Sequence, residues 1–173
     1  FMNKGLASTE YIVNQGYGIP FACLYSVNVP NLMFAGRNIS ASHIAFATVR
    51  VMGTCAVVGQ AAGTAAALAV KYDMTIRELG KERIEELQDI LMDDDCFLPG
   101  FRRESSELTK RATLTADYGD CSALLNGLGR RIWGNDNGYY GKTNKAITYT
   151  FDEPTHIGGV RLVFDSDLDR EYT

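Results

Sequence analysis

The sequence predicts an α+β fold assembled from parts of two structural units. Only five of the first 72 residues are charged, whereas residues 73–111 are rich in charge. From residue 112 onward, short alternating runs are separated by Gly, Asn and Asp. We therefore expect a strand, a loop and helices over 1–98, a linker over 99–111, and a short antiparallel β unit, part of a sandwich, over 112–173.

Composition excludes several classes of protein. Hydrophobic residues make up 46% of the 173 residues and charged residues 22%, which is typical of a folded chain. The net charge of -4 provides no global positive field, so we expect no nucleic-acid partner. The four cysteines include no CxxC pair, and we predict no metal site. The chain begins at Phe1, which suggests a piece of a longer polypeptide.

The first elements are an extended segment, a strand and a polar loop. Residues 19–26 look extended, and the apolar run 31–35 ends at Gly36, as a buried strand would. A polar loop then runs to His43. Residues 44–52 are ambiguous between helix and loop.

An uncharged run over residues 51–70 predicts a long helix. Thr54 is the natural N-cap, and the helix should end near residues 72–73. The run is long enough to cross a membrane, but it is mostly Ala, Gly and Thr, so we expect no membrane span. We expect instead a helix buried on all sides, with Gly59 and Gly63 packed closely against a sheet.

Two further helices and three strands complete the expected order. Thr75 and Glu78 form a capping-box pattern, and Gly80 separates this turn from an amphipathic helix over 81–92. The acidic run 93–95 is most simply a solvated helix end. Alternation predicts antiparallel strands over 113–116, 146–151 and 160–164.

The loop and helix start over residues 36–55 form the main candidate site. A glycine after a strand lets a ligand approach the backbone, and a helix N-terminus offers free N–H groups. Arg37 and Arg50 are the only cations between Lys4 and Lys71, and each is either a ligand-binding residue or an ion-pair partner. His43 is either a loop histidine bonded to the backbone or a proton donor. The chain contains neither a Walker A motif nor a GxGxxG fingerprint.

Residues 19–98 resemble the C-terminal part of FAD-dependent oxidoreductases that share the fold of the fumarate reductase and succinate dehydrogenase flavoproteins. The matching stretches are NLMFAGRNISASHIAF, VRVMGTCAVVGQAAGTAAALAV and RELGKERIEELQDIL. The resemblance implies that Gly36 and Arg37 line the flavin cleft. It also implies that the segment from Arg50 to Cys55 wraps the flavin ring. That segment comprises Arg50, Val51, Met52, Gly53, Thr54 and Cys55.

The resemblance implies hydride transfer at flavin N5, with Arg50 and His43 as catalytic residues and a small-molecule substrate that the sequence does not identify. It places a Rossmann half with the glycine fingerprint upstream of Phe1. We therefore expect these residues alone to be inactive, to retain no FAD, and to self-associate through the apolar surface left exposed.

The C-terminal unit resembles the start of a galactose-binding-like, discoidin-type β-sandwich. The resemblance rests on ATLTAD at 112–117, on Trp133 and on VRLVFDSDLDR at 160–170. It implies a saccharide contact through Trp133, Tyr139 and Tyr140, although for Trp133 itself we favour the alternative, that it is the core aromatic of the unit. A carbohydrate-binding or interaction module, with the helices as scaffold, is thus the alternative function. A sugar-binding tail favours an exported protein.

Overall fold

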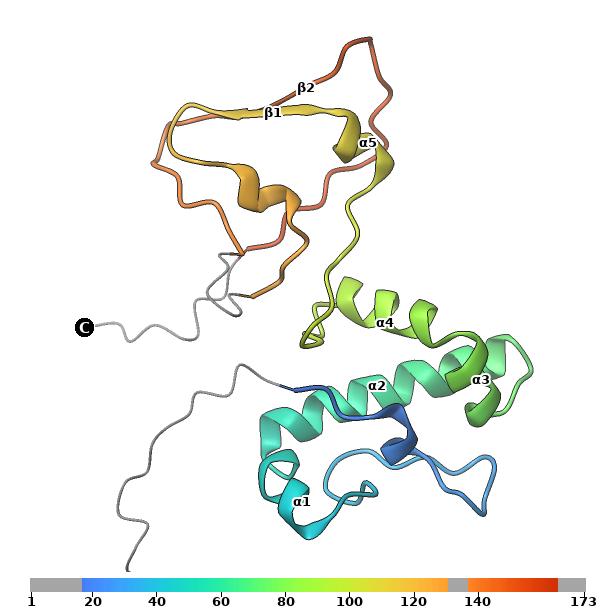
Figure 1. Ribbon diagram of the computed structural model, residues 1–173. Coiled ribbons are helices and arrows are strands. Elements are labelled where there is room, and N and C mark those ends of the chain that lie inside the picture. Colours follow the sequence, from blue (N-terminus) through green and yellow to red (C-terminus); the bar gives the residue numbers. More distant parts are fainter. Residues whose placement is uncertain (1–16, 131–136, 165–173) are drawn as a thin grey trace, which may run out of the picture.

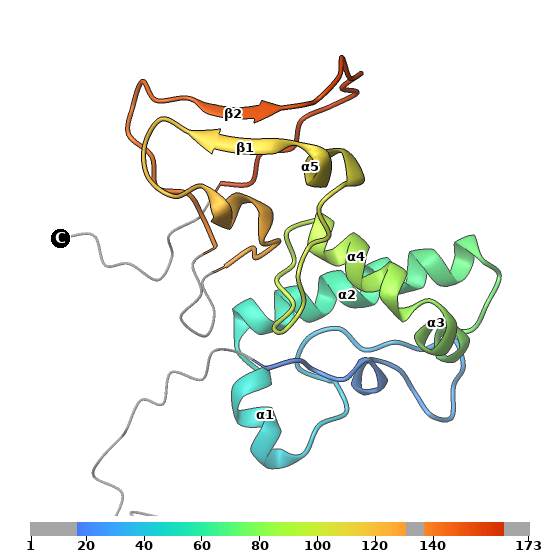
Figure 2. The ribbon, with the colours of Figure 1, turned by 45° about the horizontal axis from the view of Figure 1, so that its top comes forward.

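The computed structural model describes residues 17–130 and 137–164, and the described chain is α+β, as predicted (Figure 1). Its helices are α1 (His43–Val49), α2 (Met52–Lys71), α3 (Ile76–Glu82), α4 (Ile84–Asp93) and α5 (Glu107–Arg111). The strands are β1 (Thr113–Ala116) and β2 (Ile147–Thr150), and two 3-10 turns are η1 (Phe21–Leu24) and η2 (Ser122–Leu125). The helices and the β unit form separate parts of the molecule (Figures 1 and 2).

The main core lies where α3 and α4 pack against α2. Both views show α4 lying alongside α2 (Figure 2), and α2 contacts both shorter helices. Leu79 and Leu87 are the largest fully buried side chains, with exposed fractions of 0% and 2%. The cluster consists of Ala65, Leu68, Leu79, Leu87, Leu91 and Cys96. Burial of Cys96 raises the pKa of its thiol, so this cysteine behaves as a small core hydrophobe.

The capping box at the start of α3 is confirmed. The amide of Glu78 donates to Thr75 Oγ1 at 3.2 Å, and the amide of Thr75 donates to Glu78 Oε2 at 2.8 Å. These hydrogen bonds from Thr75 lower the pKa of Glu78. The cap therefore stabilises the helix above the ordinary carboxylate pKa and loses that contribution as the pH falls.

The predicted helix break at Gly80 is wrong, because α3 continues through Gly80 and ends at Glu82. A Cβ atom at Gly80 would lie 2.7 Å from Cδ1 of Phe21, inside van der Waals contact. The glycine thus allows η1 to pack against α3. The break falls at Arg83, which precedes α4.

The strand predicted over residues 31–35 does not form. Residues 19–26 contain η1 rather than an extended segment, and a single bridge pairs Tyr25 with Met33. Backbone hydrogen bonds from Phe34 to Leu24 and from Ser26 to Leu32 hold the two segments together. A strand needs a partner along its length, and the described residues provide only this bridge.

Two expectations about the long helix are corrected. It begins at Met52 with Val51 as N-cap, and Thr54 is not the cap, because α1 ends at Val49 with Arg50 as C-cap and Val51 is extended. It is buried on one face only. The buried residues are Val58, Ala62, Ala65, Leu68 and Ala69. By length and composition α2 could cross a membrane, and 28% of its most apolar window is buried in the structure.

The β unit is a two-stranded antiparallel sheet in which Leu114 pairs with Tyr149 and Ala116 with Ile147. Residues 160–164, predicted as a strand, have no regular structure, and Val160 and Phe164 are exposed. Two strands cannot bury a sheet face by themselves, so apolar side chains such as Ile147 remain accessible. The segment predicted as a linker contains α5.

Candidate functional site

The predicted site residues come from three adjoining segments, the loop after Gly36, α1, and the start of α2. Gly36 has φ +95°, a conformation that favours glycine. A Cβ atom built on it would lie 3.9 Å from Cβ of Cys55 in the first turn of α2. The fold therefore brings Gly36 and Cys55, which are 19 positions apart, into contact.

A buried apolar platform supports these segments. Ile39 from the loop, Val49 from α1 and Val58 from α2 are 7%, 4% and 3% exposed and pack in one cluster with Leu24. The thiol of Cys55 donates to the carbonyl oxygen of Val49 at 3.7 Å, which links the end of α1 to α2. The polar groups of the site thus stand on a packed base.

His43 and Arg50 lie on the same side of α1. His43 is the first residue of the helix, and Arg50 is its C-cap. A spacing of seven residues corresponds to about two helical turns, or roughly 10 Å along the axis. The guanidinium of Arg37 lies over the ring of Phe46, with Cζ 5.8 Å from the ring centroid. Phe46, one turn after His43, therefore places Arg37 beside this helix by a cation–π contact.

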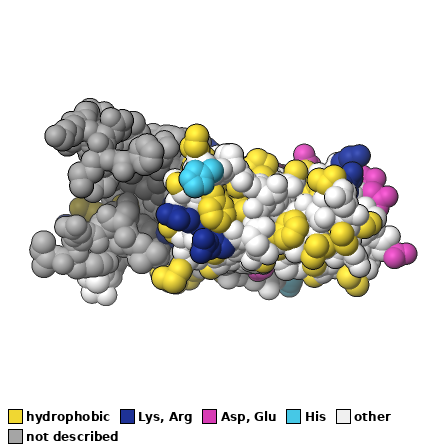
Figure 3. All heavy atoms as spheres, turned by 90° about the horizontal axis from the view of Figure 1, so that it is seen from below, with side chains coloured by type: hydrophobic (Ala, Val, Ile, Leu, Met, Phe, Trp, Pro, Cys, Tyr) yellow, Lys and Arg dark blue, Asp and Glu magenta, His cyan; other side chains and the backbone are white. Residues whose placement is uncertain are grey.

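Phe46 is the positioning residue that the sequence analysis missed. Phe46 follows His43 by three residues, and residues three apart share a helix face. This spacing is the sequence pattern from which its place could have been predicted. Figure 3, which views the molecule from below, shows a His side chain next to basic side chains, with hydrophobic side chains nearby.

Neither Arg37 nor Arg50 has an acidic partner in the part of the chain that the structure describes. No Asp or Glu occurs between Glu10 and Asp73, and neither Arg37 nor Arg50 makes an ion pair with any residue that the structure describes. Both side chains belong to exposed residues. Of the two alternatives for these arginines, the arrangement favours ligand binding over structural ion pairing.

The start of α2 is an uncapped helix N-terminus. Its N-cap, Val51, has no side-chain oxygen, and no side-chain cap is formed. The first amides, those of Met52, Gly53 and Thr54, precede the first amide that closes a helical turn, that of Cys55 to Val51. Met52 is 90% exposed, and a Cβ on Gly53 would meet nothing within 4 Å. An electron-rich ligand atom can therefore reach these N–H groups.

The C-terminal candidates are not gathered in the same way. The hydroxyl of Tyr139 donates to the carbonyl of Tyr118, so it serves the unit's own structure. Tyr140 lines a cleft of about 600 Å³ together with Arg102, Asp120 and Asn126. Trp133 lies outside the described residues. A saccharide contact through these aromatics stays a prediction.

Comparison with known families adds the deciding observation. The family model described as FAD dependent oxidoreductase matches residues 3–91. The chain belongs to this family. The match covers the loop, α1, α2, α3 and most of α4, and it ends before the β unit. Neither curated proteins nor solved structures gave a significant match to the chain.

The site's residues fit the cofactor that the family implies. FAD-dependent oxidoreductases use a flavin ring whose N1 and O2 edge becomes electron-rich on reduction, and the α2 N-terminus with Gly36 and Gly53 offers donors and space. The sequence contains no glycine fingerprint of the kind that holds the ADP portion in Rossmann folds. Within 17–130 and 137–164, no group of three metal-ligating side chains occurs.

Proposed function

We propose that this chain supplies the wall of a flavin site in an FAD-dependent oxidoreductase of the fumarate reductase type. The observation that carries the proposal is the uncapped N-terminus of α2, which lies next to Gly36 and begins two residues after Arg50. Donors and cations that have no acidic partner within residues 17–130 and 137–164 are suited to an electron-rich ligand.

A bound flavin supplies hydride chemistry at its N5 atom, which leaves negative charge near N1 and O2. The amides of Met52, Gly53 and Thr54 stabilise negative charge held in front of them, and they do so without reorganising. Gly36 and Gly53 leave the backbone accessible. Val51 and Cys55 bracket this turn, and Cys55 fixes it to the end of α1.

Arg50 and His43 have separate roles in the proposal. Arg50 binds and orients a small-molecule substrate through acceptor atoms, since a guanidinium donates in a planar fork. His43 is the proton-transfer group in this proposal, because its exposed imidazole at the start of α1 can both accept and donate a proton. Arg37, held by Phe46, supplies a second positive charge beside the same helix.

The ADP portion of FAD is held, in this proposal, by residues outside these 173, in a Rossmann half of the same protein. The exposed side of α2 supports this. Met52 and Val70 are 90% and 83% exposed, and the open positions Gly59 and Gly63 have nothing within 4 Å of a built Cβ. Such a face would let another backbone approach closely. In the absence of the Rossmann half, this exposed apolar face would cause the chain to self-associate.

Flavin content tests the proposal. Full-length protein is expected to elute from gel filtration with a stoichiometric flavin absorbance spectrum, and the 173-residue chain prepared in parallel is expected to be colourless. Full-length protein without flavin would contradict the flavin site. A coloured 173-residue chain would instead contradict the assignment of the ADP portion to other residues.

A further inference from the structure

The C-terminal end of α4 concentrates negative charge. Helix carbonyls already give this end a partial negative charge, and carboxylates there are unfavourable unless cations compensate them. The last turn contains no basic residue, and Asp93, Asp94 and Asp95 follow one another. Compensation must therefore come from other parts of the chain.

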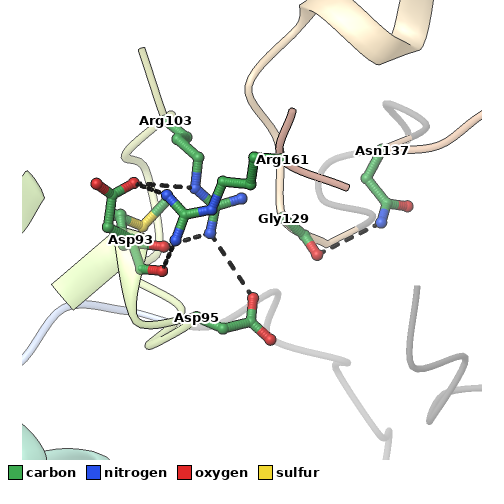
Figure 4. Close-up of polar contacts among 7 residues, drawn as sticks. Asp93, Asp95, Arg103, Gly129, Asn137 and Arg161 are labelled. Atoms are coloured by element: carbon green, nitrogen blue, oxygen red, sulfur yellow. Dashed lines mark hydrogen bonds and ion pairs between the residues drawn. The ribbon is translucent and has the colours of Figure 1, made fainter. Parts of the chain in front are cut away.

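Two arginines from distant segments supply it (Figure 4). Arg103 donates to the carbonyl of Met92, and its Nε lies 3.6 Å from Oδ1 of Asp93. Arg161 donates to the same Oδ1 at 2.5 Å and to the carbonyl of Asp93. The Asp93 carboxylate and the carbonyls of Met92 and Asp93 thus all contact one or both of these guanidinium groups. The end of α4 is therefore not the simple solvated helix end that the sequence suggests.

Arg103 is fixed to the C-terminal part of the chain by its backbone. Its amide donates to the carbonyl of Gly127 at 2.8 Å, and Gly127 has φ +71°. A Cβ atom at Gly127 would lie 2.1 Å from the Arg103 carbonyl oxygen, so the two backbones are too close for any side chain. Arg161 follows β2. Both arginines therefore connect the β unit to α4.

We propose that the end of α4 is an electrostatic docking point that holds the C-terminal unit against the flavoprotein region, with Asp93 as the shared anchor. The side chains of Asp93 and Arg161 are 57% and 53% exposed, and that of Arg103 is 18% exposed. A single exposed pair contributes little, but two arginines on one carboxylate form a network. The attachment should loosen as salt screens it.

Hydrogen exchange of residues 99–106, which join the two parts, tests this in the full-length protein. Asp93→Asn and Arg161→Gln are each expected to speed exchange there, by about fivefold for Asp93→Asn. The double variant should speed exchange by less than the sum of the two single effects, because both changes remove the pair between the side chains of Arg161 and Asp93, whereas only Arg161→Gln also removes the bond to the Asp93 carbonyl. Raising NaCl to 0.5 M should speed exchange in the unmodified protein.

Arg111→Gln is the matched control, since it breaks the 3.4 Å pair with Glu153 without touching α4, and it should leave the segment unchanged. Single variants whose exchange rates in this segment match that of Arg111→Gln would overturn the proposal. A double variant whose effect equals the sum of the two single effects would also overturn it. Equally fast exchange throughout α2 and α4 would also overturn it, because Asp93 would then hold the helices themselves.

Discussion

Replacing Leu79 with alanine is expected to lower the free energy of unfolding of the helical region by about 2–5 kcal/mol. The side chain is 0% exposed and lies in the cluster that joins α2, α3 and α4. The change removes buried methyl groups and leaves a cavity that three helices cannot easily close. Because a small domain is stable by only about 5–15 kcal/mol, this single change should take a large share of that stability.

Urea unfolding of the 173-residue chain, followed by far-UV circular dichroism, measures this loss. Val70→Ala is the matched control, because Val70 lies on the same long helix but is 83% exposed. The control should change the free energy of unfolding by less than about 0.5 kcal/mol. Equal losses in the two variants would mean that Leu79 is not at the centre of the core.

Replacing Arg50 with alanine is expected to lower the midpoint potential of the bound flavin in the full-length protein by about 30 mV or more. This corresponds to roughly 1.4 kcal/mol for a two-electron couple. Arg50 is the C-cap of α1, directly before Val51, the N-cap of α2, and it makes no ion pair with any described residue. Its charge favours the electron-rich state of the flavin, so its loss makes the flavin harder to reduce.

A spectroelectrochemical titration gives the potential, with Arg111→Ala as a control in which an arginine is lost from α5, far along the chain. Arg50→Lys should recover part of the potential, because it restores the charge without the planar fork. A potential that is the same in Arg50→Ala and the control would show that Arg50 does not face the flavin.

Elements with complete local signals could be predicted from the sequence. Thr75 and Glu78 supply both halves of a capping box, and Leu87 and Leu91 stand one turn apart on α4. The strands around Leu114 and Tyr149 form and pair antiparallel as expected, although burial alternates along β1 only. In each case the residues that determine the element lie within a few positions of one another.

Elements that depend on distant partners could not be predicted. Residues 31–35 have the composition of a buried strand, yet they find only a bridge between Met33 and Tyr25. Gly80 looks like a helix break because its sequence neighbours do not reveal the Phe21 ring against it. The start of α2 at Met52 depends on where α1 ends, which is likewise a property of the packed structure.

For the candidate site, too, some features could be predicted from local sequence and others could not. Arg37, His43, Arg50 and Gly36 could be identified from residue type and spacing alone. Their arrangement could not, because Arg37 is placed by Phe46 and Gly36 by its contact with Cys55. Sequence therefore predicts which groups are present, and packing decides which of them can act on one ligand.

Amide hydrogen exchange at Met52, Gly53 and Thr54 tests the central claim most directly. In the full-length protein, bound flavin should slow exchange of these amides by about tenfold relative to the flavin-free form. The first amides of α4, which also lack a side-chain cap, serve as the internal comparison and should not change. Protection at α2 alone is the predicted result, and equal exchange with and without flavin at both helices would contradict it.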